Sequence, residues 1–171
     1  MRKIISIFKY YDYINFFKRK NKHYELKIGS QNIKNKEITI NEILNGHDNL
    51  ILKIDIEGSE YKILKQILSN AKKINTLLIE FHDIQKNMNF IKKFIELSND
   101  LKLIHIHGNN YSCTDKNINP NIIELTFTNI KKIGFKQKIT EKNYPIDKLD
   151  YKNIPRKKDF ILKFEDDTKI S

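Results

Sequence analysis

The chain has 171 residues, 39% of them hydrophobic, which is enough for one domain with a buried core. No stretch approaches the ~20 consecutive apolar residues of a membrane-spanning helix, so we expect residues 1–171 to form a single soluble domain. The net charge is +11, but arginine occurs only at positions 2, 19 and 156, and the lysines are spread along the whole chain. Because specific nucleic-acid recognition relies on the planar fork of arginine, this pattern argues against a nucleic-acid partner.

Residues 1–22 are predicted to form a basic amphipathic helix. Apolar side chains recur at three-to-four spacing from Ile4 to Ile14, and basic residues flank them on both sides. Such a helix either covers a face of the core, which we favour, or makes weak contact with an anionic membrane surface.

The start of the chain resembles a secretion signal only briefly. Lys9 interrupts the apolar run that follows Met1, and no small-residue cleavage site comes after it. Cys113 is the only cysteine, so no intrachain disulfide can form. We therefore expect a cytoplasmic protein.

Segments typical of strands and helices alternate over the first two thirds of the chain. A short strand is expected at 23–29, and Thr39 and Glu42 have the spacing of a capping box at the start of a short helix. The apolar run 49–56 is typical of a strand buried on both faces, and Ser59 is a candidate cap for the helix after it. Strands and helices are expected in turn at residues 49–56, 59–70, 76–81, 88–99 and 101–107. This order predicts an α/β fold with right-handed crossovers and a parallel sheet.

The last third of the chain has a different pattern. Residues 108–120 form a polar loop, and residues 121–128 and 160–164 alternate between apolar and polar. Because no crossover helix separates these final strands, we expect them to pair antiparallel. Residues 165–171 are expected to be a frayed tail.

Pairs of polar side chains lie where the predicted parallel strands end. In each pair the residues are two apart, which directs both side chains to the same face of a strand. Ligands bind at the carboxyl ends of strands in an open parallel sheet, so we expect the pairs to form a site. The alternative is that they are structural, as solvated acids, an ion pair or a core histidine, and that Glu60 only complements the dipole of the following helix. The pairs are Asp55 with Glu57, Glu80 with His82, and His105 with His107.

Carboxylates and imidazoles support two kinds of chemistry. Either can act as a general base on a hydroxyl that attacks an electrophile. Together they can instead hold a divalent cation, Mg²⁺ where oxygen ligands dominate or a transition metal where histidine takes part. The sequence has no HExxH motif, and its single cysteine offers no cysteine-based zinc site. The spacing leaves both roles open.

The first of these strand ends resembles the hallmark of a known enzyme family. The stretch Leu52-Lys53-Ile54-Asp55-Ile56-Glu57-Gly58-Ser59-Glu60 is similar to the acidic K-I-D-x-E-G-x-E turn of FkbM methyltransferases. Four more segments resemble the family in the same order, at residues 39–44, 79–82, 107–110 and 120–127. The resemblance covers about residues 38–164.

The resemblance implies a Rossmann-like class I methyltransferase sheet that uses S-adenosylmethionine to methylate a hydroxyl of a sugar, polysaccharide precursor or natural product. The expected catalytic residues are Asp55, Glu57, Glu80 and His82. The candidate ligands of a divalent cation such as Mg²⁺ are Asp55, Glu80, His82 and His107. The residues expected to contact the small-molecule or glycan acceptor are Asn109, Asn110 and Glu124.

The front of the chain departs from the family pattern. Members begin with a Gly-rich turn that lets the backbone approach the cofactor, whereas glycine occurs here only at positions 29, 46, 58, 108 and 134. The comparison therefore implies an N-terminally truncated fold whose cofactor-binding residues cannot be assigned and whose sheet a second chain or a homodimer would complete. The alternative is a non-catalytic truncated protein or a binding module.

Overall fold

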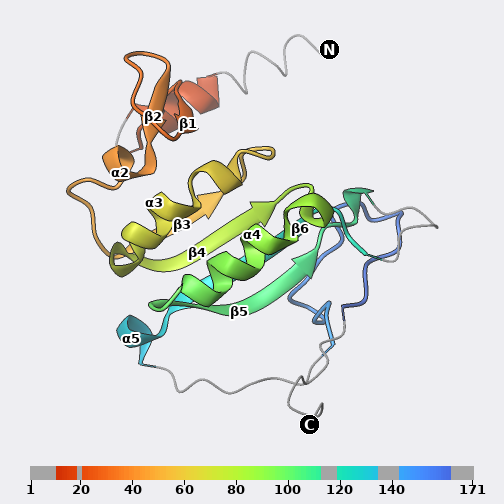
Figure 1. The fold of residues 1–171 in the computed structure, drawn as a ribbon. Coiled ribbons are helices and arrows are strands. Elements are labelled where there is room, and N and C mark those ends of the chain that lie inside the picture. Colours follow the sequence, from red (N-terminus) through yellow and green to blue (C-terminus); the bar gives the residue numbers. More distant parts are fainter. Residues whose placement is uncertain (1–10, 19–20, 113–118, 135–142, 163–171) are drawn as a thin grey trace.

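The computed structural model describes residues 11–18, 21–112, 119–134 and 143–162 (Figure 1). In these residues the strands are β1 (Lys27–Gly29), β2 (Glu37–Thr39), β3 (Leu50–Ile54), β4 (Ile74–Phe81), β5 (Leu101–Gly108) and β6 (Ile123–Asn129). The α-helices are α2 (Ile40–Ile43), α3 (Leu64–Ser69), α4 (Ile84–Leu97) and α5 (Ile130–Ile133). Short 3₁₀ turns lie at η1 (Glu60–Lys62), η2 (Ala71–Lys73) and η3 (Asn110–Ser112).

The main sheet has four strands in the order β3-β4-β6-β5. β3 pairs parallel with β4, while β6 pairs antiparallel with both β4 and β5. It follows that β3, β4 and β5 all run in one direction, with β6 inserted between the last two in the opposite direction. This arrangement confirms an α/β fold with a mixed sheet and an antiparallel final strand.

Helices α3 and α4 cover one face of this sheet (Figure 1). Phe94 of α4 packs edge-on against Phe127 of β6, with ring centroids 5.3 Å apart, and lies 6.3 Å from the ring of Phe81 in β4. All three rings are almost inaccessible to solvent. Since successive side chains of a strand point to opposite faces, Glu80 and Glu124 project to the face away from these helices.

β3 is an edge strand, and the prediction that it is buried on both faces is wrong. Its burial alternates along the strand, and the side chain of Ile51 is 75% exposed. Its partner in the register, Thr76, is half-buried, and Leu78 on the same face of β4 is exposed. An apolar composition is shared by buried and edge strands, so the run of Ile and Leu did not distinguish them.

The two predicted helix caps have different outcomes. Thr39 caps α2 as expected, because its Oγ1 accepts the backbone N–H of Glu42 at 3.2 Å. The backbone N–H of Thr39 donates to Oδ1 of Asn32 at 2.8 Å. That bond takes the place of the one to the Glu42 carboxylate in a complete capping box. The cap predicted at Ser59 is wrong, since its side chain makes no capping hydrogen bond and the chain enters the 3₁₀ turn η1 before α3 begins.

The N-terminal part of the chain packs against α3. Strands β1 and β2 form a small parallel sheet beside α2. The side chain of Gln66 in α3 makes two hydrogen bonds to this N-terminal part. It accepts the N–H of Ile40 at 2.8 Å and donates to the carbonyl of Gly29 at 3.0 Å. The buried side chains of Ile40 and Leu44 extend the core toward it.

Residues 11–17 are helical, but they do not cover the core as we favoured from the sequence. Tyr11 and Phe16 are 60% and 59% exposed, and Tyr13 packs on Phe17 within the same segment. The rest of the predicted helix, residues 1–10 and 19–20, lies outside the described residues. Of the helices in the described ranges, none is long and apolar enough to cross a membrane.

Residues 143–162, here called the strap, lie beside the C-terminal end of β5 and the N-terminal end of β6 (Figure 1). Tyr144 and Leu162 form an antiparallel bridge, with backbone bonds of 3.1 and 2.9 Å, that closes the strap into a loop. Phe160 is buried against Gly108, where an added Cβ would lie 3.1 Å from its Cβ. Of the predicted strand 160–164, the structure describes only residues 160–162, and the predicted tail 165–171 also lies outside the described residues.

Candidate active site

Polar side chains from three strands form a row across the sheet. Glu80 of β4 lies opposite Glu124 of β6 in the register, and Glu124 lies opposite His107 of β5. Residues opposite each other in adjacent strands share a face, so these three side chains point to the same side. The parallel pairing of Ile54 with Ile79 places the next residue, Asp55, beside Glu80 at the end of the row. The structure therefore brings Asp55, Glu80 and His107 of the predicted strand ends into one row.

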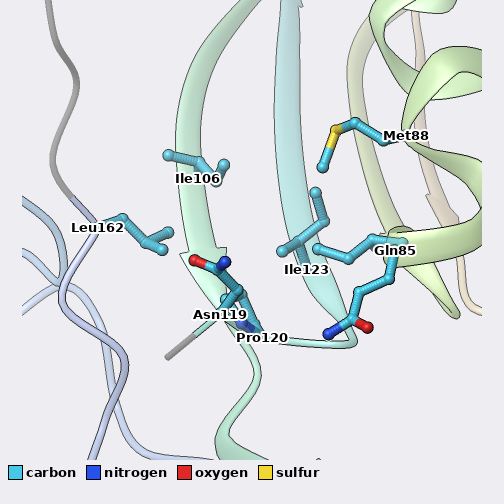
Figure 2. Close-up of a pocket in the computed structure, with 8 residues that line it drawn as sticks. Gln85, Met88, Ile106, Asn119, Pro120, Ile123 and Leu162 are labelled. Carbon is cyan, nitrogen blue, oxygen red and sulfur yellow. The ribbon is translucent and has the colours of Figure 1, made fainter. Parts of the chain in front are cut away.

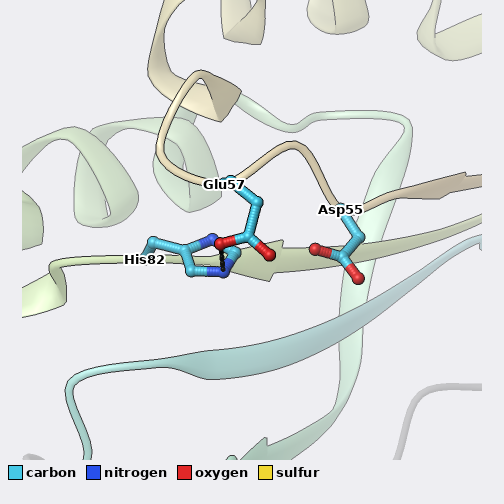
Figure 3. A group of neighbouring side chains, drawn as sticks. All are labelled: Asp55, Glu57 and His82. Carbon is cyan, nitrogen blue, oxygen red and sulfur yellow. Dashed lines mark ion pairs between the residues drawn. The ribbon is translucent and has the colours of Figure 1, made fainter.

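At the end of this row, Asp55 lies close to Glu57 and His82 (Figure 3). Each offers one ligand atom, and these atoms lie within 4.8 Å of one another. Nε2 of His82 is 3.4 Å from a Glu57 oxygen and 3.6 Å from a Glu80 oxygen. The side chain of Glu57 is 86% exposed and that of His82 only 12%, so a solvent-facing acid stands over a nearly buried imidazole. The arrangement can accept a proton or hold a cation.

Glu60 supports His82 from the interior, a role that its place in the sequence did not indicate. Its side chain is fully buried, and its Oε1 lies 2.8 Å from Nδ1 of His82 and accepts the backbone N–H of Gly58 at 3.0 Å. The hydroxyl of Tyr61 donates to the carbonyl of His82 at 2.5 Å. Glu60 is the last acid of the hallmark, but its expected position in the first turn of the following helix was equally consistent with the alternative that it only complements the helix dipole.

The backbone of the hallmark turn adopts left-handed conformations. Glu57 has φ of +51° and Gly58 has φ of +90°. Glycine tolerates such angles without steric cost, whereas Glu57 is held in a sparsely populated region. The turn directs the Glu57 carboxylate toward His82 and the Gly58 N–H toward Glu60.

Burial raises the pKa of Glu80 above its ordinary value, and the nearby carboxylates of Asp55 and Glu124 raise it further. His82 and the hydrogen bond that the amide of Asn109 donates at 3.1 Å oppose this shift. Because the raised pKa favours the neutral acid, Glu80 is the carboxyl of the row best placed to hold a proton.

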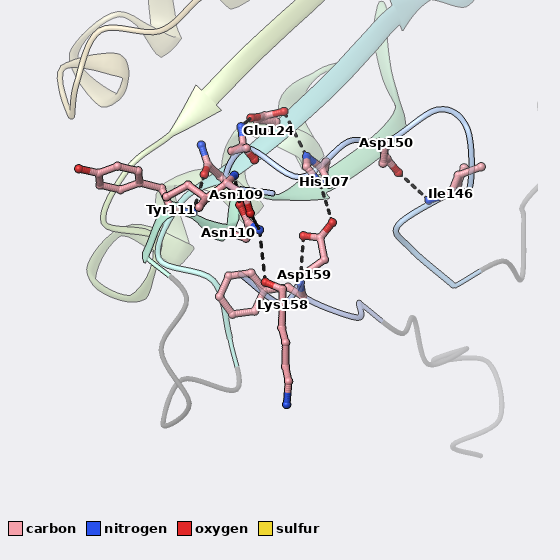
Figure 4. Close-up of polar contacts among 12 residues, drawn as sticks. His107, Asn109, Asn110, Tyr111, Glu124, Ile146, Asp150, Lys158 and Asp159 are labelled. Atoms are coloured by element: carbon pink, nitrogen blue, oxygen red, sulfur yellow. Dashed lines mark hydrogen bonds and ion pairs between the residues drawn. The ribbon is translucent and has the colours of Figure 1, made fainter. Parts of the chain in front are cut away.

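His107 belongs to a second cluster that joins the sheet to the strap (Figure 4). Its Nδ1 is 3.3 Å from Glu124 Oε2, and its Nε2 is 3.6 Å from Asp159 of the strap, too far for a hydrogen bond. The hydrogen bond to Glu124 is the main reason that the pKa of His107 is raised, and it is also the main reason that the pKa of Glu124 is lowered. The ligand group of Asp55, Glu57 and His82 does not include His107.

His105 also pairs with the strap and not with the neighbouring strand ends. Its Nε2 lies 2.7 Å from Oδ1 of Asp150, and its ring packs edge-on against Tyr144 at 5.1 Å. The other carboxylate oxygen of Asp150 accepts the N–H of Ile146 at 2.6 Å. The pair predicted at the end of β5 therefore holds residues 143–162 against the sheet.

Asn109 and Asn110 have separate roles. Asn109 is buried and reaches across to Glu80, so it touches the polar row. Asn110 is fully buried, and its amide donates to the carbonyls of Ile154 and Lys158 and accepts the N–H of Ile154 (Figure 4). These three bonds give Asn110 a structural role, and an acceptor contact by either Asn stays a prediction.

A pocket of about 480 Å³ lies on the other face of the same strand ends (Figure 2). Ile106 and Ile123 line it, each next in sequence to a residue of the polar row, and they therefore point away from that row. Its other walls come from α4, residues 119–120 and Leu162. The largely apolar lining provides no group for acid or base chemistry and separates this pocket from the candidate site.

Residues 9–113 match the family model described as the methyltransferase FkbM domain. The match spans more than half of the chain and contains the hallmark turn, β4 and β5 with the polar residues that end them. The chain belongs to the FkbM methyltransferase family. This confirms the resemblance seen in the sequence, although the match starts earlier than residue 38 and ends before β6 and the strap. No curated protein and no solved structure matched the chain.

Membership of the FkbM family implies S-adenosylmethionine, and the strand ends fit one part of it. Asp55 and Glu57 are exposed carboxylates at the open edge of the row, which suits the positive charge of a sulfonium. No two of the five glycines are close enough in the sequence to form a Gly-rich turn. We therefore assign no residue to the adenosine half of the cofactor.

Proposed function

We propose that this FkbM family member is an S-adenosylmethionine-dependent O-methyltransferase with a Rossmann-like class I fold. The supporting observation is the position of His82, whose Nε2 faces two carboxylates at the carboxyl end of a strand in a domain of a methyltransferase family. We propose that the acceptor is a small molecule or glycan with a hydroxyl that reaches this edge. S-Adenosylmethionine supplies an electrophilic methyl group when it is bound.

In this proposal the chain's own residues control the proton. Nε2 of His82 takes the proton of the acceptor hydroxyl as its oxygen becomes a nucleophile. The carboxylate of Glu57, 3.4 Å away, then stabilises the imidazolium. Asp55 lies at the outer end of the row, where its carboxylate can accept a hydrogen bond from a second hydroxyl of the acceptor.

A divalent cation is a second role for the same atoms. The oxygens of Asp55 and Glu57 and the Nε2 of His82 lie close enough to share one ion, and a bound cation would lower the pKa of a coordinated hydroxyl. The two roles exclude each other at Nε2, because a lone pair bound to a metal cannot accept a proton. Titration with Mg²⁺ and Mn²⁺, monitored by calorimetry on the wild type and on Asp55→Asn, decides between them.

The open edge of the sheet favours a partner chain. Among the described residues, β3 has a hydrogen-bonded neighbour strand on one side only, and Ile51 and Leu78 are exposed on the face away from α3 and α4. Exposed strand edges readily pair with another strand. We propose that a second chain, in the simplest case another copy, completes the sheet at β3, and light scattering over a concentration series tests this.

Calorimetry of the purified chain with S-adenosylmethionine tests the cofactor. We expect saturable binding, and no heat of binding at millimolar cofactor would contradict independent catalysis by this chain. Transfer of a radiolabelled methyl group to a panel of monosaccharides then tests the base. His82→Gln should reduce the rate by about 10²–10⁴-fold, the usual contribution of a general base. His47→Gln, at an exposed histidine just after a turn, is the matched control.

A further inference from the structure

Glu60 is an unusual acid because its side chain has no access to solvent. Charged side chains are seldom fully buried unless they are paired. Within the described part of the chain, its two hydrogen bonds both involve Oε1, one with His82 and one with Gly58, while Oε2 is buried without a partner. A carboxylate in such a place loses its hydration, so its contacts with His82 and Gly58 must compensate for that loss.

The contact fixes which ring nitrogen of His82 carries the proton. A carboxylate only accepts hydrogen bonds, so the 2.8 Å bond to Glu60 requires a hydrogen on Nδ1. In the neutral ring the lone pair then lies on Nε2, the nitrogen that faces Glu57 and Glu80. With the opposite tautomer, Nε2 would carry a hydrogen and could neither take a proton from a hydroxyl nor bind a cation.

We propose that Glu60 is a positioning residue of the methyl-transfer site, which holds the His82 ring as the Nδ1–H tautomer with its Nε2 lone pair directed at the open edge. The proposal rests on the proposed function of His82 and holds for either of its roles, general base or cation ligand. Carboxylates that accept the second ring N–H of a functional histidine set its tautomer and orientation in both kinds of site.

Two neighbours of Glu60 keep the geometry in place. The N–H of Gly58 donates to the same Oε1 and so orients the carboxylate, and glycine permits the φ of +90° that this needs. The hydroxyl of Tyr61 donates to the carbonyl of His82 and fixes the backbone that carries the ring. Two contacts from η1, made by Glu60 and Tyr61, therefore hold His82 just after the end of β4, and the Gly58 N–H orients the first of them.

The tautomer of His82 is measured directly by ¹⁵N NMR of the imidazole nitrogens at about pH 9, well above the ordinary histidine pKa of about 6.5. We expect the Nδ1–H form for His82 in the wild type, with exposed His47 as the internal reference. Glu60→Gln should keep this form, because the Gly58 N–H holds the amide oxygen in the place of Oε1. Glu60→Met has similar volume but no acceptor, and its His82 should move to the Nε2–H form.

The NMR measurement needs neither methyl donor nor acceptor, so its failure is distinct from a failure of the proposed function. An Nε2–H form in the wild type, or an unchanged tautomer in Glu60→Met, would overturn the proposal even if the chain methylates a hydroxyl. If Glu60→Met does not fold, the wild-type tautomer still decides. With an acceptor in hand, Glu60→Met should lose about 10–100-fold in rate and Glu60→Gln much less.

Discussion

Replacement of Asn110 by Ala tests how the strap is held to the strand ends. The substitution removes three hydrogen bonds, with Ile154 O at 3.0 Å, Lys158 O at 3.3 Å and Ile154 N at 2.8 Å. At about 1 kcal/mol each, they amount to roughly 3 kcal/mol if the strap stays in place. The strap can also detach and return those groups to water. The loss in the free energy of unfolding therefore cannot exceed the free energy with which the strap docks. We therefore expect the free energy of unfolding to fall by about 2–3 kcal/mol.

Urea unfolding and hydrogen exchange separate these outcomes. In Asn110→Ala the amides of Ile154 and Leu162 should lose protection, because the first donates to Asn110 and the second is bonded to Tyr144 across the closing bridge. Asn89→Ala, at an exposed position of α4, is the control and should leave both amides unchanged. A loss below about 0.5 kcal/mol with normal protection at Ile154 would refute the structural role of Asn110.

The remaining predictions concern the pH response, the hallmark turn and the N-terminal helix. The raised pKa of His107 contributes stability that is complete below about pH 6.5 and is lost as pH rises through the raised value. The lowered pKa of Glu124 contributes stability that is complete above about pH 4.5 and is lost as pH falls through the lowered value. The urea concentration at the unfolding midpoint should therefore decline as pH rises above 6.5, and His107→Gln should remove that decline. A His107→Gln variant with the wild-type pH profile would contradict the pairing of His107 with Glu124. Gly58→Ala and Gly46→Ala both force a side chain into a positive φ and should each cost about 1–2 kcal/mol, but only Gly58→Ala should disturb the ¹⁵N signals of His82. Equal disturbance in both variants would show that the Gly58 contact to Glu60 has no specific role. If the exposed aromatic side chains at the N-terminus touch anionic membranes, Tyr11→Ser with Phe16→Ser should weaken sedimentation with phosphatidylserine vesicles, and Tyr151→Ser, exposed elsewhere, should not.

The main sheet could be predicted from the sequence because its signals are local. The apolar runs that became β4 and β5 and the alternation in β6 depend on side chains next to each other in the chain. In β4 and β6, buried residues recur two apart, at 77, 79 and 81 and at 123, 125 and 127. The exposure of Ile51 could not be predicted, because it depends on which strands lie beside β3 and on what covers its face. Both depend on contacts between residues far apart in the sequence.

The site shows the same division. The convergence of Asp55, Glu57, Glu80 and His82 followed from the rule that parallel strands end at one edge of a sheet. The contact between His105 and Asp150 could not be predicted from the sequence. The two residues are 45 positions apart, and the strap has no regular secondary structure from which its course could be predicted. Glu60 was visible in the hallmark, but its complete burial is a property of the folded turn alone.

The central claim is that the strand ends around His82 form the methyl-transfer edge of this FkbM family member. A titration of the ¹⁵N-labelled chain with S-adenosylmethionine, monitored by NMR, tests it most directly, because it needs no knowledge of the acceptor. We predict saturable shifts concentrated at the amides of residues 55–60 and 80–82. No shifts at millimolar cofactor, or shifts confined to the strap and the apolar pocket, would contradict the claim.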